Sequence, residues 1–189
     1  MRGLGQEYQN ATASTGGDFE TLPPGGYVCK ITSAKDYPNG NDFSDKPYLE
    51  IVYDIAEGEH AGFYNDDWGK AHEWAHSTRW YYTPAALGMF KGNLKAVDDS
   101  NGTSFEDNAV DGIDERRLAG CLVGMIIGEE EYASNTGETR IRLNVRGIRP
   151  AATIREGRFK VPELKKLAAN EEPLIPSKPE NTNLEDLPF

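Results

Sequence analysis

Residues 48–55 read YLEIVYDI, and this stretch decides the fold class. One face of it carries Leu49, Ile51, Tyr53 and Ile55, which is the alternation of a half-buried β-strand. Residues 139–148 repeat the pattern, with apolar side chains on one face and arginines on the other. The sequence therefore predicts an antiparallel sheet with a buried face and a polar face.

Further strands and one helix complete the expected order. Strands are predicted at 27–35, at 63–64 resuming over 78–82 after an irregular insertion, and at 121–127. Thr83-Pro84 starts a helix whose apolar residues recur at helical spacing until 98–102 ends it, and a short helix is expected over 114–118. The prediction is a mainly β fold: an OB-fold-like five-stranded antiparallel barrel with one helix between strands 3 and 4. A generic antiparallel sandwich has a similar order.

The composition divides the chain of 189 residues into three parts. Residues 1–18 are polar and predicted to be a flexible leader, and residues 170–189, rich in proline and acids, a disordered tail. Residues 19–169 remain as one OB-like domain. No apolar run approaches the roughly 20 residues of a membrane span, and the first residues lack the apolar core of a secretory signal. Two cysteines without metal-site spacing favour a reduced, cytoplasmic setting and predict no cofactor.

Charge is unevenly distributed in a chain whose net charge is −11. Residues 139–166 hold nine Lys or Arg against two acids, whereas 170–189 hold one Lys against five acids. Sequence-neutral binding of single-stranded DNA needs cations along the phosphates and aromatic rings under the bases. The residues predicted to bind single-stranded DNA are Arg79, Trp80, Tyr82, Arg140, Arg142, Arg146, Trp68 and Trp74. Trp80 and Tyr82 are expected to face outward on their strand.

The last residues read LEDLPF, an apolar tip in an otherwise polar tail. Such a tip suits a docking peptide, because a ring can fill an apolar pocket while acids steer it toward a basic rim. The predicted docking residues are Glu185, Asp186, Leu187, Pro188 and Phe189.

Two resemblances add to this interpretation. The ending is similar to the acidic tip of bacterial single-stranded DNA-binding proteins, which implies recruitment of replication, recombination and repair enzymes. The body resembles a family of small phage and mobile-element proteins placed among single-stranded DNA-binding proteins. The matching stretches are LPPGGYVCKI (22–31), YLEIVYDIAEGEHAGF (48–63), FKGNLKAVDDSN (90–101), LAGCLVGMIIGEEEY (118–132) and REGRFKVPELKKL (155–167). This implies a role in DNA replication or recombination in a bacterial host cell. The sequence does not fix whether the chain forms a homo-oligomer.

Residues 72–76, HEWAH, match the H-E-x-x-H zinc motif and supply the main alternative. On a helix this spacing places two imidazoles, here His72 and His76, on one face with the glutamate as general base. Few helix-stabilising residues flank the motif, and it interrupts a β-domain, so a plain loop is favoured over a zinc metallopeptidase. P-loop, dinucleotide-binding and serine-hydrolase motifs are absent, so the chain is predicted not to be an enzyme. A third hypothesis is a replication adaptor that binds only proteins.

Overall fold

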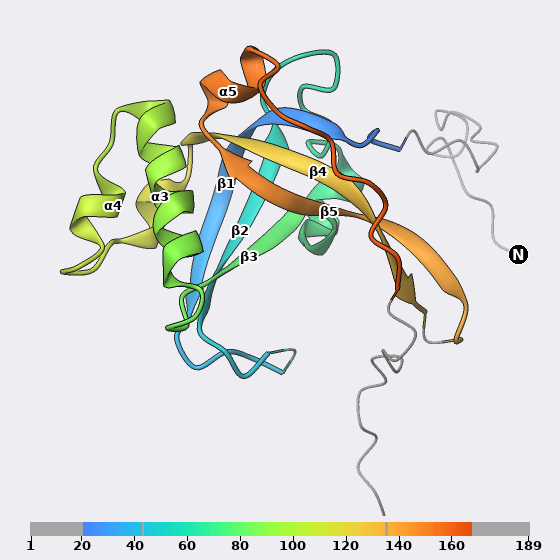
Figure 1. Cartoon of the computed structure of the whole chain (residues 1–189), viewed down its shortest axis with the longest axis horizontal. Coiled ribbons are helices and arrows are strands. Elements are labelled where there is room, and N and C mark those ends of the chain that lie inside the picture. The colour runs from blue at the N-terminus through green and yellow to red at the C-terminus, as the bar shows by residue number, and fades with distance from the viewer. Residues whose placement is uncertain (1–20, 43, 135, 168–189) are drawn as a thin grey trace, which may run out of the picture.

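A five-stranded antiparallel sheet forms the centre of the computed structural model, which describes residues 21–42, 44–134 and 136–167 (Figure 1). The strands are β1 (Gly25–Tyr37), β2 (Tyr48–Ile55), β3 (Ser77–Tyr81), β4 (Leu122–Ala133) and β5 (Thr139–Arg149). They lie side by side in the order β3-β2-β1-β4-β5, and every neighbouring pair is antiparallel. The mainly β class and the antiparallel pairing predicted from the sequence are confirmed.

The helices are short apart from one. They are α2 (Asp67–Ala71), the 3₁₀ turn η1 (Glu73–His76), α3 (Leu87–Asn101), α4 (Phe105–Asn108), the 3₁₀ turn η2 (Glu115–Leu118) and α5 (Ala151–Arg155). The long helix α3 lies between β3 and β4 in the chain, and Gly102 ends it in the left-handed conformation with φ of 68°. Within the ranges described, none of these helices has the length and apolar character needed to cross a bilayer.

The core lies between one face of the sheet and α3. The four alternating residues of β2 predicted to share a face are all buried there, joined by Leu94 and Val97 of α3. Because side chains alternate along a strand, the opposite face needs its own cover. The helix α3 covers only one face of the sheet, so another segment must cover the apolar side chains on the opposite face.

Residues 150–167, called here the C-terminal strap, supply part of that second cover (Figure 1). Two glycines let the strap lie close to the sheet. A Cβ at Gly26 would stand 2.5 Å from the ring of Phe159, and one at Gly128 would stand 2.8 Å from Pro162. The strap ends beside β4, where Lys165 pairs in parallel with Glu130.

The predicted closed barrel is not confirmed, because the sheet is open. β3 and β5 are the two edge strands of the described part and are not paired with each other. Residues 63–64, predicted to begin the third strand, lie in a turn, and the chain up to residue 76 forms turns, α2 and η1. β3 is therefore only five residues long. The leader (1–18) and the tail (170–189) lie outside the described residues.

Candidate nucleic-acid interface

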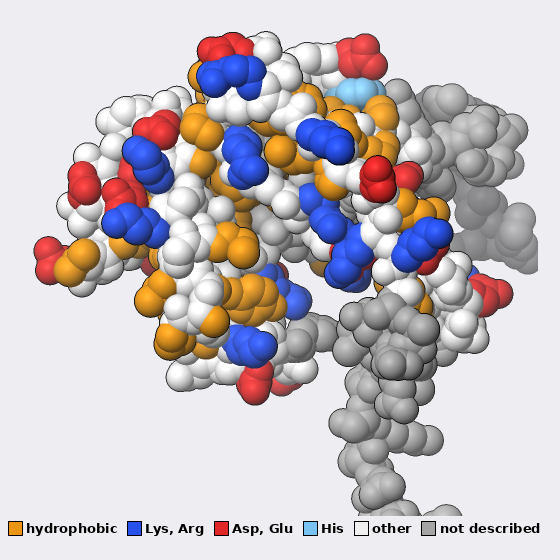
Figure 2. All heavy atoms as spheres, in the orientation of Figure 1, with side chains coloured by type: hydrophobic (Ala, Val, Ile, Leu, Met, Phe, Trp, Pro, Cys, Tyr) orange, Lys and Arg blue, Asp and Glu red, His pale blue; other side chains and the backbone are white. Residues whose placement is uncertain are grey.

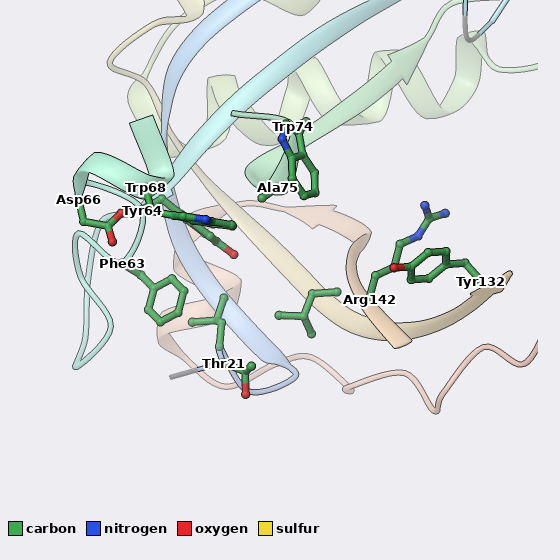
Figure 3. A pocket seen from close by; sticks show the side chains of 11 residues that line it. Thr21, Phe63, Tyr64, Asp66, Trp68, Trp74, Ala75, Tyr132 and Arg142 are labelled. Carbon is green, nitrogen blue, oxygen red and sulfur yellow. The ribbon is translucent and has the colours of Figure 1, made fainter. Parts of the chain in front are cut away.

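An open cavity of about 790 Å³ lies between the segment that joins β2 to β3 and the β4–β5 hairpin (Figure 3). We call it the aromatic cavity, since its lining is mostly aromatic and apolar. The lining residues are Thr21, Leu22, Phe63, Tyr64, Asp66, Trp68, Trp74, Ala75, Tyr132, Arg142 and Leu143. Trp68 and Trp74 remain 46% and 73% exposed. The structure thus brings three of the residues predicted for DNA binding, Trp68, Trp74 and Arg142, around one hollow.

Trp68 is held by the short helix that carries it. The Asp66 side chain caps α2 by accepting a 2.7 Å hydrogen bond from the backbone N–H of Gly69. Gly69 packs so tightly that a Cβ there would meet the Tyr64 carbonyl oxygen at 2.2 Å. The indole of Trp68 stacks on the His72 ring, with centroids 4.6 Å apart and planes 18° apart. Its position is therefore fixed although much of its surface faces solvent.

Trp74 lies on η1, which His76 anchors to the sheet. The His76 ring is buried, with Nδ1 within hydrogen-bond distance of the Tyr53 carbonyl oxygen and Nε2 3.1 Å from that of Gly69. It also stacks on Tyr64 at 4.5 Å. Trp74 meets Trp68 edge to face, with 6.4 Å between ring centroids. The two indoles consequently form one aromatic rim.

The same contacts bear on the HEWAH alternative. Residues 72–76 do not form one α-helix, because His72 ends α2 and η1 is a 3₁₀ turn. Both His76 ring nitrogens face backbone carbonyls, and no three His, Cys, Asp or Glu side chains of the described residues are grouped as a metal site. The ligand geometry that a zinc metallopeptidase requires is not present at this motif.

Tyr132 and Arg142 form the opposite wall of the aromatic cavity, on the β4–β5 hairpin (Figure 3). The Arg142 guanidinium lies 5.2 Å from the centroid of the Tyr132 ring, a cation–π distance. A guanidinium Nη atom is also 3.8 Å from a carboxylate oxygen of Glu130. Arg142 is half exposed, so part of its side chain is open to solvent while it rests on the Tyr132 ring.

Glu130 connects this wall to the C-terminal strap. It is buried, and it accepts hydrogen bonds from Asn144 at 2.6 Å and Lys165 at 3.0 Å. Burial by itself would raise the pKa of Glu130. The hydrogen bonds from Asn144 and Lys165, together with the charges of Lys165 and Arg142, outweigh burial and lower that pKa. The charged Glu130 carboxylate therefore holds the C-terminal strap beside the β4–β5 hairpin through its bond with Lys165.

The other predicted arginines of β5 do not line the cavity. Arg140 pairs with Glu138 at 3.0 Å, and Arg146 is exposed where the β4–β5 register shifts. Lys and Arg side chains nevertheless gather over α5 and β5 on the face shown in Figure 2. The basic stretch inferred from the sequence is a surface feature, and neighbouring acids partly neutralise it.

The expectation for β3 is wrong for Trp80. Its side chain is 2% exposed, because Trp80 pairs with Leu49 and points to the core face of the sheet. Tyr82, just after the strand, is half-buried and donates a 2.7 Å hydrogen bond to Asp36. Burial and this bond raise the pKa of Tyr82. Arg79 points to the opposite face, and its guanidinium lies 5.3 Å from the centroid of the Tyr48 ring.

Sequence reasoning missed several aromatic residues near these cations. Tyr132 lines the aromatic cavity, and on the outer face of β1–β3 the rings of Tyr37 and Tyr48 stack at 4.9 Å, with Tyr81 beside Tyr48. Tyr48 falls on the polar face of YLEIVYDI, yet its side chain is fully buried beside Tyr37 and Tyr81. No pattern marks Tyr132, because its role depends on the path of the distant segment that carries the two indoles.

The predicted docking tip, residues 185–189, lies outside the described residues. No protein-family model and no curated protein matches the sequence.

Proposed function

We propose that the protein binds single-stranded DNA without sequence preference, in replication or recombination of phage or mobile-element DNA. The main support for this proposal is the aromatic cavity, where two exposed indoles face a tyrosine and an arginine across one open hollow. A base has a π-face whatever its identity, so rings that stack bases bind sequence-neutrally. The cavity offers such rings beside a cation that can contact the adjacent phosphate.

Burial and exposure support this choice of site. Trp74 leaves 73% of its surface in water, which is unfavourable for so large a ring unless a ligand covers it. Stacking on His72 positions the Trp68 indole before a base binds, so little of its side-chain freedom is lost when a base stacks on it. Rings that already have their bound positions favour binding, because less conformational entropy is lost when the complex forms.

The architecture also supports the proposal. Five strands with α3 between the third and the fourth fit an OB-like interpretation, and OB-folds bind oligonucleotides. In this proposal the chain's net charge of −11 disfavours general attraction to DNA, so binding depends on the local cations and rings. The tip at 185–189 is proposed to recruit replication or recombination proteins to the coated strand.

The direct test is titration of the full chain with an oligo-dT strand and with a duplex of the same length, each at low and high salt. Tryptophan fluorescence is the readout, because Trp68 and Trp74 are exposed while Trp80 is buried and serves as the unquenched background. We expect quenching by the single strand, weaker binding by the duplex, and loss of affinity with salt. Equal binding of both DNA forms, or no quenching in dilute buffer, contradicts the proposal.

Matched arginine variants locate the site. Arg142→Gln is expected to weaken oligo-dT binding and lower the salt slope by about one. Arg116→Gln is the control, because Arg116 is likewise exposed and paired with an acid, Asp114, but lies on η2. Arg79→Gln tests the tyrosine stack on β1–β3, and a loss there without a loss for Arg142→Gln moves the site to that stack.

A further inference from the structure

A second cavity, of about 540 Å³, lies on a different side of the molecule, between α3, the loop from α4 to η2 and the sheet. We call it the α3 groove. Its apolar lining includes Leu87, Phe90, Leu94, Val110, Ile113 and Tyr82. Its volume is within the roughly 300–1,000 Å³ that ligand-binding pockets occupy. None of these residues lines the aromatic cavity.

Several large apolar side chains at and beside the α3 groove are exposed to solvent. Val110 is 91% exposed and Leu87 52%, and Met89, on the same turn of α3 as Leu87, is 73% exposed. Hydrophobic side chains gather around the lower part of α3 in Figure 2. A contiguous apolar patch of this kind marks an interaction site on a folded protein.

The segment that leads into the Val110 loop, at the start of α4, is held against α3. The Asp98 carboxylate of α3 accepts hydrogen bonds from the N–H groups of Phe105 and Glu106, each at 2.8 Å, and from the Thr103 hydroxyl at 2.6 Å. Lys91 of α3 pairs with Glu106 at 2.8 Å across the groove. The groove is thus preformed rather than created by a partner.

Its rim is acidic. Asp36, Glu106 and Glu115 line the groove, and the one Lys or Arg in that lining, Lys91, is already paired with Glu106. Residues 103–115 contain five acids and no Lys or Arg. Such a rim repels nucleic acid and acidic peptides, and attracts basic ones.

We propose that the α3 groove is a docking site for a segment of a partner protein whose apolar side chains are flanked by Lys or Arg. The apolar side chains enter between α3 and the loop at Val110, and the flanking cations face Asp36 and Glu115, because Glu106 is already neutralised by Lys91. Charge excludes the chain's own end as the occupant, because residues 180–189 carry three acids and no base. The proposal is independent of DNA binding, since the two cavities share no residue.

The test uses a labelled synthetic peptide in which Leu and Phe alternate with Lys, and a second peptide with Glu in place of every Lys. Binding to the full chain is measured by fluorescence anisotropy at low salt. We expect the basic peptide to bind at least about tenfold more tightly than the acidic one, and Val110→Lys to weaken it by about tenfold. Val161→Lys is the matched control, because Val161 is an exposed apolar residue of the C-terminal strap.

A second pair of variants tests the charge. Glu115→Gln is expected to weaken the basic peptide several-fold, whereas Glu163→Gln on the strap leaves binding unchanged. The groove variants Val110→Lys and Glu115→Gln should keep the melting temperature and the oligo-dT affinity of the parent chain, which separates this proposal from the proposed DNA function. Four outcomes overturn it: equal binding of both peptides, no effect of Val110→Lys, tighter binding of a peptide of residues 180–189, or self-association of the chain that Val110→Lys abolishes.

Discussion

Removing one exposed ring should separate DNA binding from folding. Trp74 is 73% exposed and contacts Trp68 and His72 only edge to face, so Trp74→Ala should change the free energy of unfolding by no more than about 0.5 kcal/mol. Stacking on an aromatic side chain contributes about 1–3 kcal/mol per base. If one base stacks on Trp74, its removal should weaken binding by about 5- to 150-fold.

The assay is anisotropy of a labelled oligo-dT, which does not depend on the tryptophans. Met89→Ala is the matched control, because Met89 has the same exposed fraction, 73%, but lies on α3. Trp74→Phe keeps a ring and should recover part of the loss. Equal affinities for Trp74→Ala and Met89→Ala, with both variants folded, would show that the aromatic rim does not contact DNA.

Four further results are expected. Arg142→Gln should weaken oligo-dT binding most at low salt, seen as a shallower plot of log affinity against log salt. Glu130→Gln should speed amide exchange at Lys165; in the parent chain the same loosening should appear as pH falls through the lowered pKa of Glu130, because a protonated carboxyl no longer holds the lysine. Gly92→Ala should raise the melting temperature by roughly 2–4 °C, since Gly92 lies inside α3 with open space at its Cβ position. Deleting residues 170–189 should tighten DNA binding at low salt if this acidic segment competes for the cations, and unchanged affinity refutes that competition.

The sequence predicts the sheet well because its information is local. Alternation in YLEIVYDI placed four core residues correctly, and the helix expected after Thr83-Pro84 is α3. Closure of a barrel, by contrast, depends on whether β3 is long enough to reach β5. β3 is short because residues 56–76 form turns and short helices instead of extending the strand. No hydrophobic periodicity in the sequence marks these turns and helices.

The candidate site was predictable in kind but not in detail. Composition identified tryptophans and arginines as the relevant side chains, and Trp68, Trp74 and Arg142 do line one cavity. Trp80 was misassigned because alternation shows which residues of a strand share a face, but not which face is buried. The pairing of Trp80 with Leu49 decides that its face is the buried one. Tyr132 could not be selected, since the two indoles across the cavity lie more than fifty residues earlier in the chain.

The two cavities impose opposite electrostatic requirements, and this limits which ligands each can take. The aromatic cavity has Arg142 on its wall and the basic face of β5 beside it, whereas the α3 groove is rimmed by acids. Raising salt should weaken both interactions, so salt alone does not distinguish them. Local charge changes do: Val110→Lys should weaken only the basic peptide, and Arg142→Gln only the oligonucleotide. If either change affects both ligands, the two surfaces are coupled, and the assignment of separate sites is wrong.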